Sequence, residues 1–202
     1  TNTVAAGIGA DLVTVGDGTN TILGDNGSLS YSGGVDSYLV QAVSSNEIQG
    51  DSDTITAGSG TNVVIGGRND ASDSAVETIT VGDGTNTILG DSGRIDYSGA
   101  GLLANVNSVP GSGGSDTITT GDGTNTIIAG SGAIDMVTDG GGANNDNIVL
   151  GDNGILTYDS DGTVKTVATS DTDGTTGGVD QITLGGGTNK LSLIHISEPT
   201  RP

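Results

Sequence analysis

The chain has 202 residues and a formal net charge of −20, from 25 acidic and five basic side chains. Aromatic residues make up only 2% of it, while Gly fills 38 positions. This composition excludes a core built on large aromatic side chains, and so few bases argue against nucleic acid or an anionic membrane surface as a partner. Gly without a strict three-residue period also excludes collagen.

One stretch, GDGTNTILGDNG at residues 16–27, recurs along the chain. It returns almost unchanged at 82–93 and 121–132, and looser copies lie at 58–67 and 185–190. Because Ile, Val and Thr recur at fixed places in these copies, we predict an ordered all-β repeat structure rather than a disordered chain.

The segments between the copies predict further strands. Thr-Ile-Thr occurs at 54–56, 78–80 and 117–119, each time directly after an acidic residue. After Tyr31, Tyr97 and Tyr158, apolar runs mix with Gly, Ser and Asp, which predicts surface hairpins or longer outer strands. A bulky residue at one place per repeat, with Met136 in the same place after Gly132, indicates a packing ladder rather than a sugar-binding stripe.

In chain order, we expect a single array over residues 1–190, with repeats near 6–47, 48–71, 72–110, 111–140, 141–174 and 175–190. Residues 191–202 (LSLIHISEPTRP) abandon the pattern, contain His195 and lack Gly. They look like a translated sequencing-library adapter, so we expect a non-native tail. The chain also opens in mid-motif, and we expect it to be an excerpt of a longer, environmental bacterial gene.

Residues 6–32 divide into three nonapeptides, AGIGADLVT, VGDGTNTIL and GDNGSLSYS. They resemble the RTX, or hemolysin-type, calcium-binding repeats with the pattern G-G-x-G-x-D-x-U-x, where U is a large apolar residue. The resemblance implies a parallel β-roll, a β-solenoid of Gly/Asp-rich repeats with hairpin-like inserts. It also implies Ca²⁺ held between stacked turns by Asp carboxylates and Gly-turn carbonyl groups.

The resemblance places calcium ligation at acidic residues in three repeat positions. The motif position holds Asp11, Asp53, Asp116, Asp146 and Asp180, the second nonapeptide adds Asp17, Asp83 and Asp122, and the third adds Asp25, Asp91 and Asp152. Glu77 takes the motif position once, and Asn20, Asn86 and Asn125 replace the motif Asp elsewhere. Because an amide oxygen is neutral, we expect weak sites or Asn hydrogen-bond ladders there.

Little in the sequence points to catalysis. Nucleophile–base pairs need His, Cys or an activated Lys, and the single His lies in the tail. Near-identical copies also imply equal roles, whereas a catalytic pair would be unique. We therefore expect no enzyme in this segment and no cofactor other than Ca²⁺.

The favoured function is structural: a secreted, extracellular or cell-surface segment of an adhesin stalk or calcium-stabilised filament. Its expected partners are flanking repeats or further copies, end to end, without nucleic acid or membrane insertion. A first alternative is the C-terminal RTX secretion module of an enzyme or toxin. A second is an ice-binding β-solenoid, because its Thr residues recur at i and i+2; we expect the inserts to interrupt such a Thr face.

Overall fold

The structure is a computed structural model. It describes residues 1–34, 37–45, 50–69, 76–111, 113–132, 134–143, 145–170 and 177–193. In these ranges the protein is all-β and contains no helix, as predicted. The described residues therefore contain no helix that is long and apolar enough to cross a membrane.

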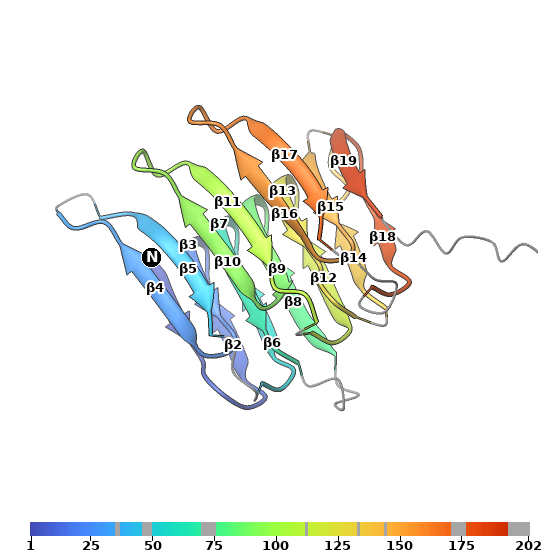
Figure 1. Cartoon of the computed structure of the whole chain (residues 1–202), viewed down its shortest axis with the longest axis horizontal. Coiled ribbons are helices and arrows are strands. Elements are labelled where there is room, and N and C mark those ends of the chain that lie inside the picture. Colours follow the sequence, from blue (N-terminus) through green and yellow to red (C-terminus); the bar gives the residue numbers. More distant parts are fainter. Residues whose placement is uncertain are drawn as a thin grey trace, which may run out of the picture.

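The strands form three sheets, two parallel and one antiparallel (Figure 1). Sheet A is parallel and contains, in spatial order, β1 (Asn2–Ala5), β3 (Gly18–Leu23), β7 (Gly60–Gly67), β9 (Gly84–Asp91), β13 (Gly123–Ile128), β15 (Asp146–Leu150) and β19 (Thr188–Ser192). Sheet B is parallel and contains β18 (Gln181–Thr183), β14 (Met136–Asp139), β12 (Asp116–Thr120), β8 (Glu77–Val81), β6 (Thr54–Ala57) and β2 (Leu12–Val15). Sheet C is antiparallel and contains β17 (Val164–Thr169), β16 (Gly154–Tyr158), β11 (Leu103–Ser108), β10 (Gly93–Tyr97), β5 (Leu39–Ser44) and β4 (Gly27–Tyr31).

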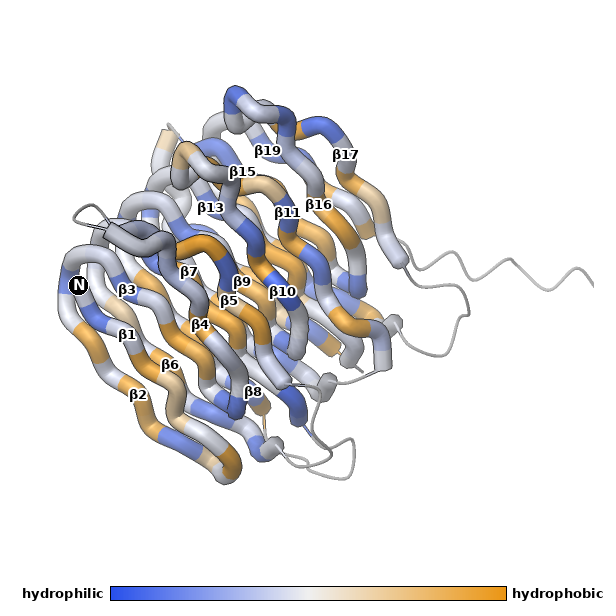
Figure 2. Tube along the Cα trace, turned by 60° about the vertical axis from the view of Figure 1, so that its left-hand side comes forward, coloured by the Kyte–Doolittle hydropathy of each residue, from blue (hydrophilic) through white to orange (hydrophobic). Residues whose placement is uncertain are grey.

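Sheet A is the middle layer, with an apolar core on each side. Successive side chains of a strand point to opposite faces, so Ile88 joins the core shared with sheet B while Leu89 joins the core shared with sheet C. Ile79 of sheet B and Ile95 of sheet C are fully buried in these two cores. Apolar residues accordingly line up in stripes across the strands (Figure 2). Burial of both faces is typical of a parallel sheet.

The chain runs repeatedly from a sheet B strand through a Gly turn to the next sheet A strand, and we refer to each such run as a passage. After β3, β9 and β15 it adds a hairpin to sheet C, whereas after β7 and β13 it goes on directly to the next sheet B strand. Two passages therefore add two strands to every sheet. Because neighbouring strands are about 4.8 Å apart in any sheet, the three layers grow at the same rate. The predicted inserts are hairpins, and they form a continuous layer.

Two details differ from the sequence-based expectation. Met136 was grouped with the Tyr residues, but it begins β14 in sheet B and is 42% exposed. No hairpin follows β13, so the chain returns directly to sheet B and Met136 begins a sheet B strand. The expected repeat boundary at residue 140 falls between β14 and β15, which belong to one passage. Leu191 and Ser192, assigned to the foreign tail, pair with β15 as part of β19; residues 194–202 lie outside the described residues.

The Tyr residues that end β10 and β16 pack against the core between sheets A and C. The Tyr158 hydroxyl lies 3.2 Å from Thr126 Oγ1, and burial raises the pKa of Tyr97 to about 12 against the lowering effect of its hydrogen bond with Thr87. These contacts agree with a packing role for both rings.

A continuous ladder of Asn side chains runs through sheet A. The six hydrogen bonds from Nδ2 of one Asn to Oδ1 of the next are 2.7–2.9 Å long. The ladder comprises Asn2, Asn20, Asn62, Asn86, Asn125, Asn147 and Asn189. Five of these residues also donate to the carbonyl of the Gly four positions earlier, which closes the turn. The predicted Asn ladder is therefore present.

Candidate cation-binding edge

A row of carboxyl groups runs along one edge of sheet B, where each strand begins. The row consists of Asp11, Asp53, Glu77, Asp116, Asp135 and Asp180. The side chains of Asp53 and Glu77 are completely buried, and Asp116 and Asp135 are 1% exposed. Backbone N–H groups fix the carboxylates in sequence: Asp11 N donates to Asp53 Oδ1 at 2.7 Å, and Asp116 N donates to Asp135 Oδ1 at 2.9 Å.

A second set of acids lies where the sheet A strands with hairpins end. Asp25, Asp91 and Asp152 are all buried there. Asp25 Oδ2 accepts a hydrogen bond from Arg68 N at 2.6 Å, and Asp152 Oδ1 accepts one from Gly178 N at 3.2 Å. These carboxylates tie the end of one passage to the loop of another. Asp25 Oδ1 and Asp91 Oδ1 are nevertheless buried without a hydrogen-bond partner among the described residues.

The first row has oxygens without a hydrogen-bond partner. Asp53 Oδ2, Glu77 Oε1 and Asp116 Oδ2 are buried and accept no hydrogen bond. Each points at a Gly of sheet A, together with a main-chain oxygen from the next strand. A Cβ added at Gly24 would meet Asp53 Oδ2 and Gly66 O. A Cβ added at Gly66 would meet Glu77 Oε1 and Gly90 O. A Cβ added at Gly90 would meet Asp116 Oδ2 and Ala129 O. A carboxylate oxygen thus faces a main-chain oxygen at each of these Gly residues.

The electrostatics of this edge favour the protonated acids. Burial raises the pKa of Asp53 to about 7, opposed by the Asp11 N–H and reinforced by repulsion from Asp25. Burial likewise raises the pKa of Asp135 to about 7 and that of Asp25 to about 6. The pKa values of Glu77, Asp91 and Asp116 are raised well above the ordinary range, first by burial and also by repulsion from neighbouring acids. A proton or a cation must therefore accompany the row.

Basic side chains do not balance this edge within the described ranges. The two ion pairs found among the described residues lie away from this edge, in the sheet C hairpins, and join Arg94 with Asp96 and Lys165 with Asp159. In the same ranges, no three acidic or His side chains converge into a ready-formed metal centre. Any bound cation would therefore draw on main-chain oxygens as well as on carboxylates.

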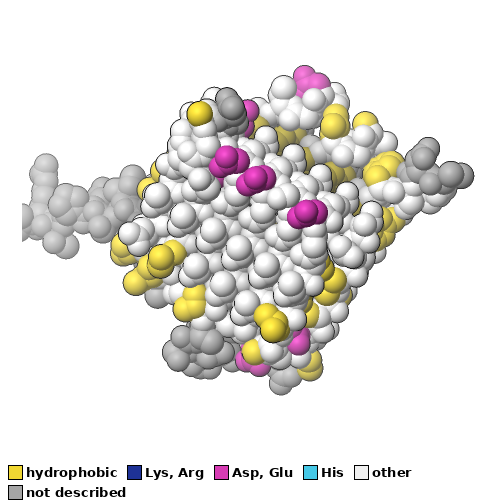
Figure 3. Space-filling view, turned by 180° about the vertical axis from the view of Figure 1, so that it is seen from behind, with side chains coloured by type: hydrophobic (Ala, Val, Ile, Leu, Met, Phe, Trp, Pro, Cys, Tyr) yellow, Lys and Arg dark blue, Asp and Glu magenta, His cyan; other side chains and the backbone are white. Residues whose placement is uncertain are grey.

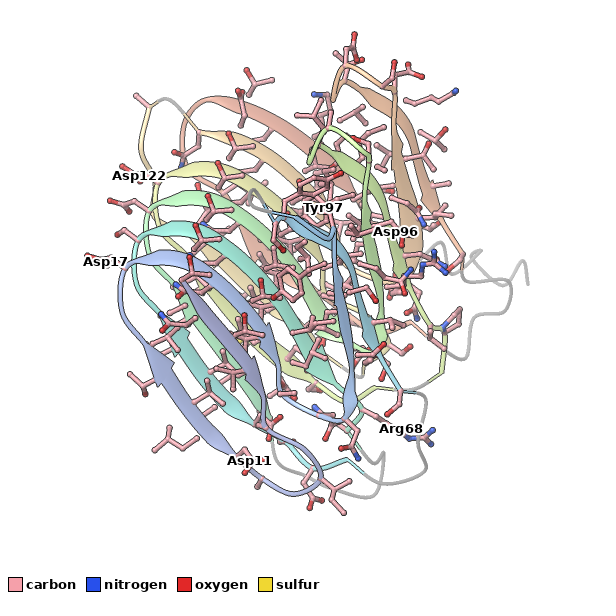
Figure 4. All side chains as sticks on the ribbon, turned by 90° about the vertical axis from the view of Figure 1, so that its left-hand side faces the viewer. Asp11, Asp17, Arg68, Asp96, Tyr97 and Asp122 are labelled. Carbon is pink, nitrogen blue, oxygen red and sulfur yellow. The ribbon has the colours of Figure 1, made fainter. Side chains whose placement is uncertain are left out.

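Three of the predicted ligands lie at the opposite edge. Asp17 and Asp122 project from the turns between sheets B and A, while Asp11 marks the buried edge (Figure 4). Each of these carboxylates accepts a hydrogen bond from a backbone N–H of the neighbouring turn. The donors are Ser59 N to Asp17 Oδ1 at 2.7 Å, Asp122 N to Asp83 Oδ1 at 2.9 Å, and Gly142 N to Asp122 Oδ1 at 2.9 Å. These exposed carboxylates bond the stacked turns, and the Asn ladder fills the adjoining interior position.

Asp146 was grouped with the motif acids, but the structure does not bring it to the carboxyl row. It begins β15 in sheet A, is exposed, and pairs in register with Thr124 and Thr188. Asp135 occupies the row instead, because β14 is the sheet B strand of this passage. The signal was present: Asp135-Met-Val-Thr matches Asp53-Thr-Ile-Thr. Glu77 also belongs to the row, although only its motif position had suggested this.

Comparison with known proteins adds no family to this description. No family model matches the chain, and neither a curated protein nor a solved structure shows significant similarity to it.

Proposed function

We propose that this chain is a segment of a secreted structural repeat protein, an adhesin stalk or filament, built as a calcium-stabilised β-roll. The proposal rests on one observation: along the buried edge, carboxylate oxygens without partners face main-chain oxygens at Gly24, Gly66 and Gly90. Calcium binds carboxylate and carbonyl oxygens together. The regular passage from sheet B to sheet A is the winding expected of a β-solenoid.

The donor groups on this edge suit calcium. Asp53, Glu77 and Asp116 would supply carboxylate oxygens, and Gly66, Gly90 and Ala129 would supply carbonyl oxygens. Bound calcium would neutralise the repelling acids. Because the row exists only when the sheets are stacked, the binding free energy would add to the stability of the folded state.

The repetition of equivalent passages supports a structural role. Each passage contributes the same Asn rung and an acid to the row. A solenoid contacts only its neighbours along its axis, so further repeats or further copies would pair with the open edges at β1 and β19 by strand addition. Rods in electron microscopy would support such association, and a monomer at every concentration in calcium would count against a filament.

The calcium assignment is tested by circular dichroism and urea denaturation in EDTA and in millimolar calcium. We expect calcium to raise the free energy of unfolding and to release protons as it binds, measured in a weakly buffered solution. Asp116→Asn should weaken this calcium response, because it removes a buried carboxylate. Asp122→Asn is the matched control, since its carboxylate is exposed at the opposite edge. A stability indifferent to EDTA, or equal responses from both variants, would refute calcium binding along the row.

A further inference from the structure

The outer face of sheet B is a regular array dominated by Thr. Its outward side chains form two columns that cross the strands in exact backbone register. One column is Thr14, Thr56, Thr80, Thr119, Thr138 and Thr183; the other is Leu12, Thr54, Thr78, Thr117, Met136 and Gln181. Neighbouring rungs are about 4.8 Å apart, and the two columns are about 6.7 Å apart along the strand. The face therefore repeats in two dimensions.

This face is uncharged although the chain carries a net charge of −20. None of the residues in the two columns is acidic or basic, and four of the six acids at the start of these strands are buried: Asp53, Glu77, Asp116 and Asp135. Figure 3 shows the face with acidic side chains only along its margins. The outer face of sheet C differs, since Arg94, Asp96 and Lys165 are in its strands.

The expectation that the inserts interrupt the Thr face is wrong. The hairpins β4–β5, β10–β11 and β16–β17 all join sheet C, on the far side of sheet A. Sheet B consequently keeps its strands adjacent from β2 to β18. The centre of the array, Thr-Ile-Thr in β6, β8 and β12, is unbroken.

The side chains of the array are rigid and available to solvent. Thr is branched at Cβ, which restricts χ1, and the Ile between each pair of Thr residues is fully buried and fixes the strand. Within the described residues, one hydroxyl of the two columns donates a hydrogen bond to the protein, from Thr78 Oγ1 to Val76 O at 3.5 Å. The remaining hydroxyls are left to bond water.

We propose that this face binds ice. A surface that repeats in two dimensions complements a partner with its own two-dimensional repeat, which a crystal has and most folded protein surfaces lack. Evenly spaced Thr hydroxyl and methyl groups can hold a layer of ordered water that joins a crystal of ice, whereas charged side chains would keep a disordered hydration shell. The uncharged array thus fits frozen water better than it fits a basic or acidic macromolecule. This inference does not depend on the calcium sites.

The test uses the full chain, fluorescently labelled, in millimolar calcium with a slowly growing ice hemisphere. We expect the wild type to enter the ice and to show thermal hysteresis. Thr80→Lys places a long charged side chain in the middle of the array and should exclude the protein from ice and abolish the hysteresis. Thr166→Lys, the same change at an exposed position of sheet C, is the control and should behave as the wild type.

Folding is checked by circular dichroism for each variant. Should Thr80→Lys fail to fold, Thr119→Lys in the neighbouring strand makes the same test. Exclusion of the folded wild type from ice would overturn the proposal, as would equal uptake of the folded array variants. Binding to crystalline cellulose or chitin through this face without uptake into ice would also overturn it, and would assign the face to a crystalline polysaccharide.

Discussion

The Asn ladder offers a sharp test of what stabilises the stacked strands, and Asn86 is its central rung. Its side chain is 1% exposed. Asn86 Nδ2 donates to Asn125 Oδ1 at 2.7 Å and to Gly82 O at 3.1 Å, and Asn86 Oδ1 accepts from Asn62 Nδ2 at 2.8 Å. Asn86→Ala removes all three hydrogen bonds and leaves buried polar atoms on both neighbouring strands.

The expected cost follows from these contacts. A hydrogen bond contributes about 1 kcal/mol net, and a buried group left without a partner costs about 1–3 kcal/mol more. Asn86→Ala should therefore lower the free energy of unfolding by about 3–5 kcal/mol, which is a large part of the stability of an ordinary domain. The donors in the ladder all point the same way along the stack, so mutual polarisation adds to this cost.

Urea denaturation at fixed calcium concentration measures the effect. Asn189→Ala is the matched control, because Asn189 makes hydrogen bonds with Asn147 and Gly185 but is exposed. Water can replace its contacts, so this variant should lose only about 1 kcal/mol. If the interior and exposed rungs cost the same, the ladder would not be a main source of stability and the reasoning from burial would fail.

Two further predictions concern the buried acids and the turns. In EDTA, the free energy of unfolding should fall as pH rises from about 5 to about 8. Burial raises the folded-state pKa values of Asp53 and Asp135 to about 7 from an ordinary value of 3.8, so the folded state loses its extra protons over this window. Urea titrations at both pH values check the sign, and a rise in stability would contradict the buried row. Gly84→Ala should lower the melting temperature of the protein more than Gly9→Ala. Both Gly residues have a positive φ, but only at Gly84 would a Cβ also meet the Gly60 backbone. A larger loss of melting temperature for Gly9→Ala would refute the close stacking of the turns.

The sequence by itself determined the local features of this protein. Alternation of apolar and polar residues has the period of a strand, and Gly turns separate the strands, so the all-β class, the hairpin inserts and the Asn rungs could be predicted from residues near one another. Asp53, Glu77 and Asp116 could be found in the same way, because an acid directly precedes each Thr-Ile-Thr segment.

The tertiary structure alone decided which of these features meet. The contacts that define the layers join residues far apart in the sequence. Asn62 and Asn86 are 24 positions apart, and Asn20 and Asn62 are 42 positions apart. No local pattern fixes such register. Stacking placed Asp135 rather than Asp146 in the carboxyl row, and it satisfied Asp17 with a backbone N–H while leaving Asp53 Oδ2 without a donor. It also placed the three described hairpins in sheet C, so none of them covers the Thr face of sheet B. Burial and hydrogen-bond partners arise only when separate strands stack, and they decide which buried acids are left without a donor and which side chains face solvent.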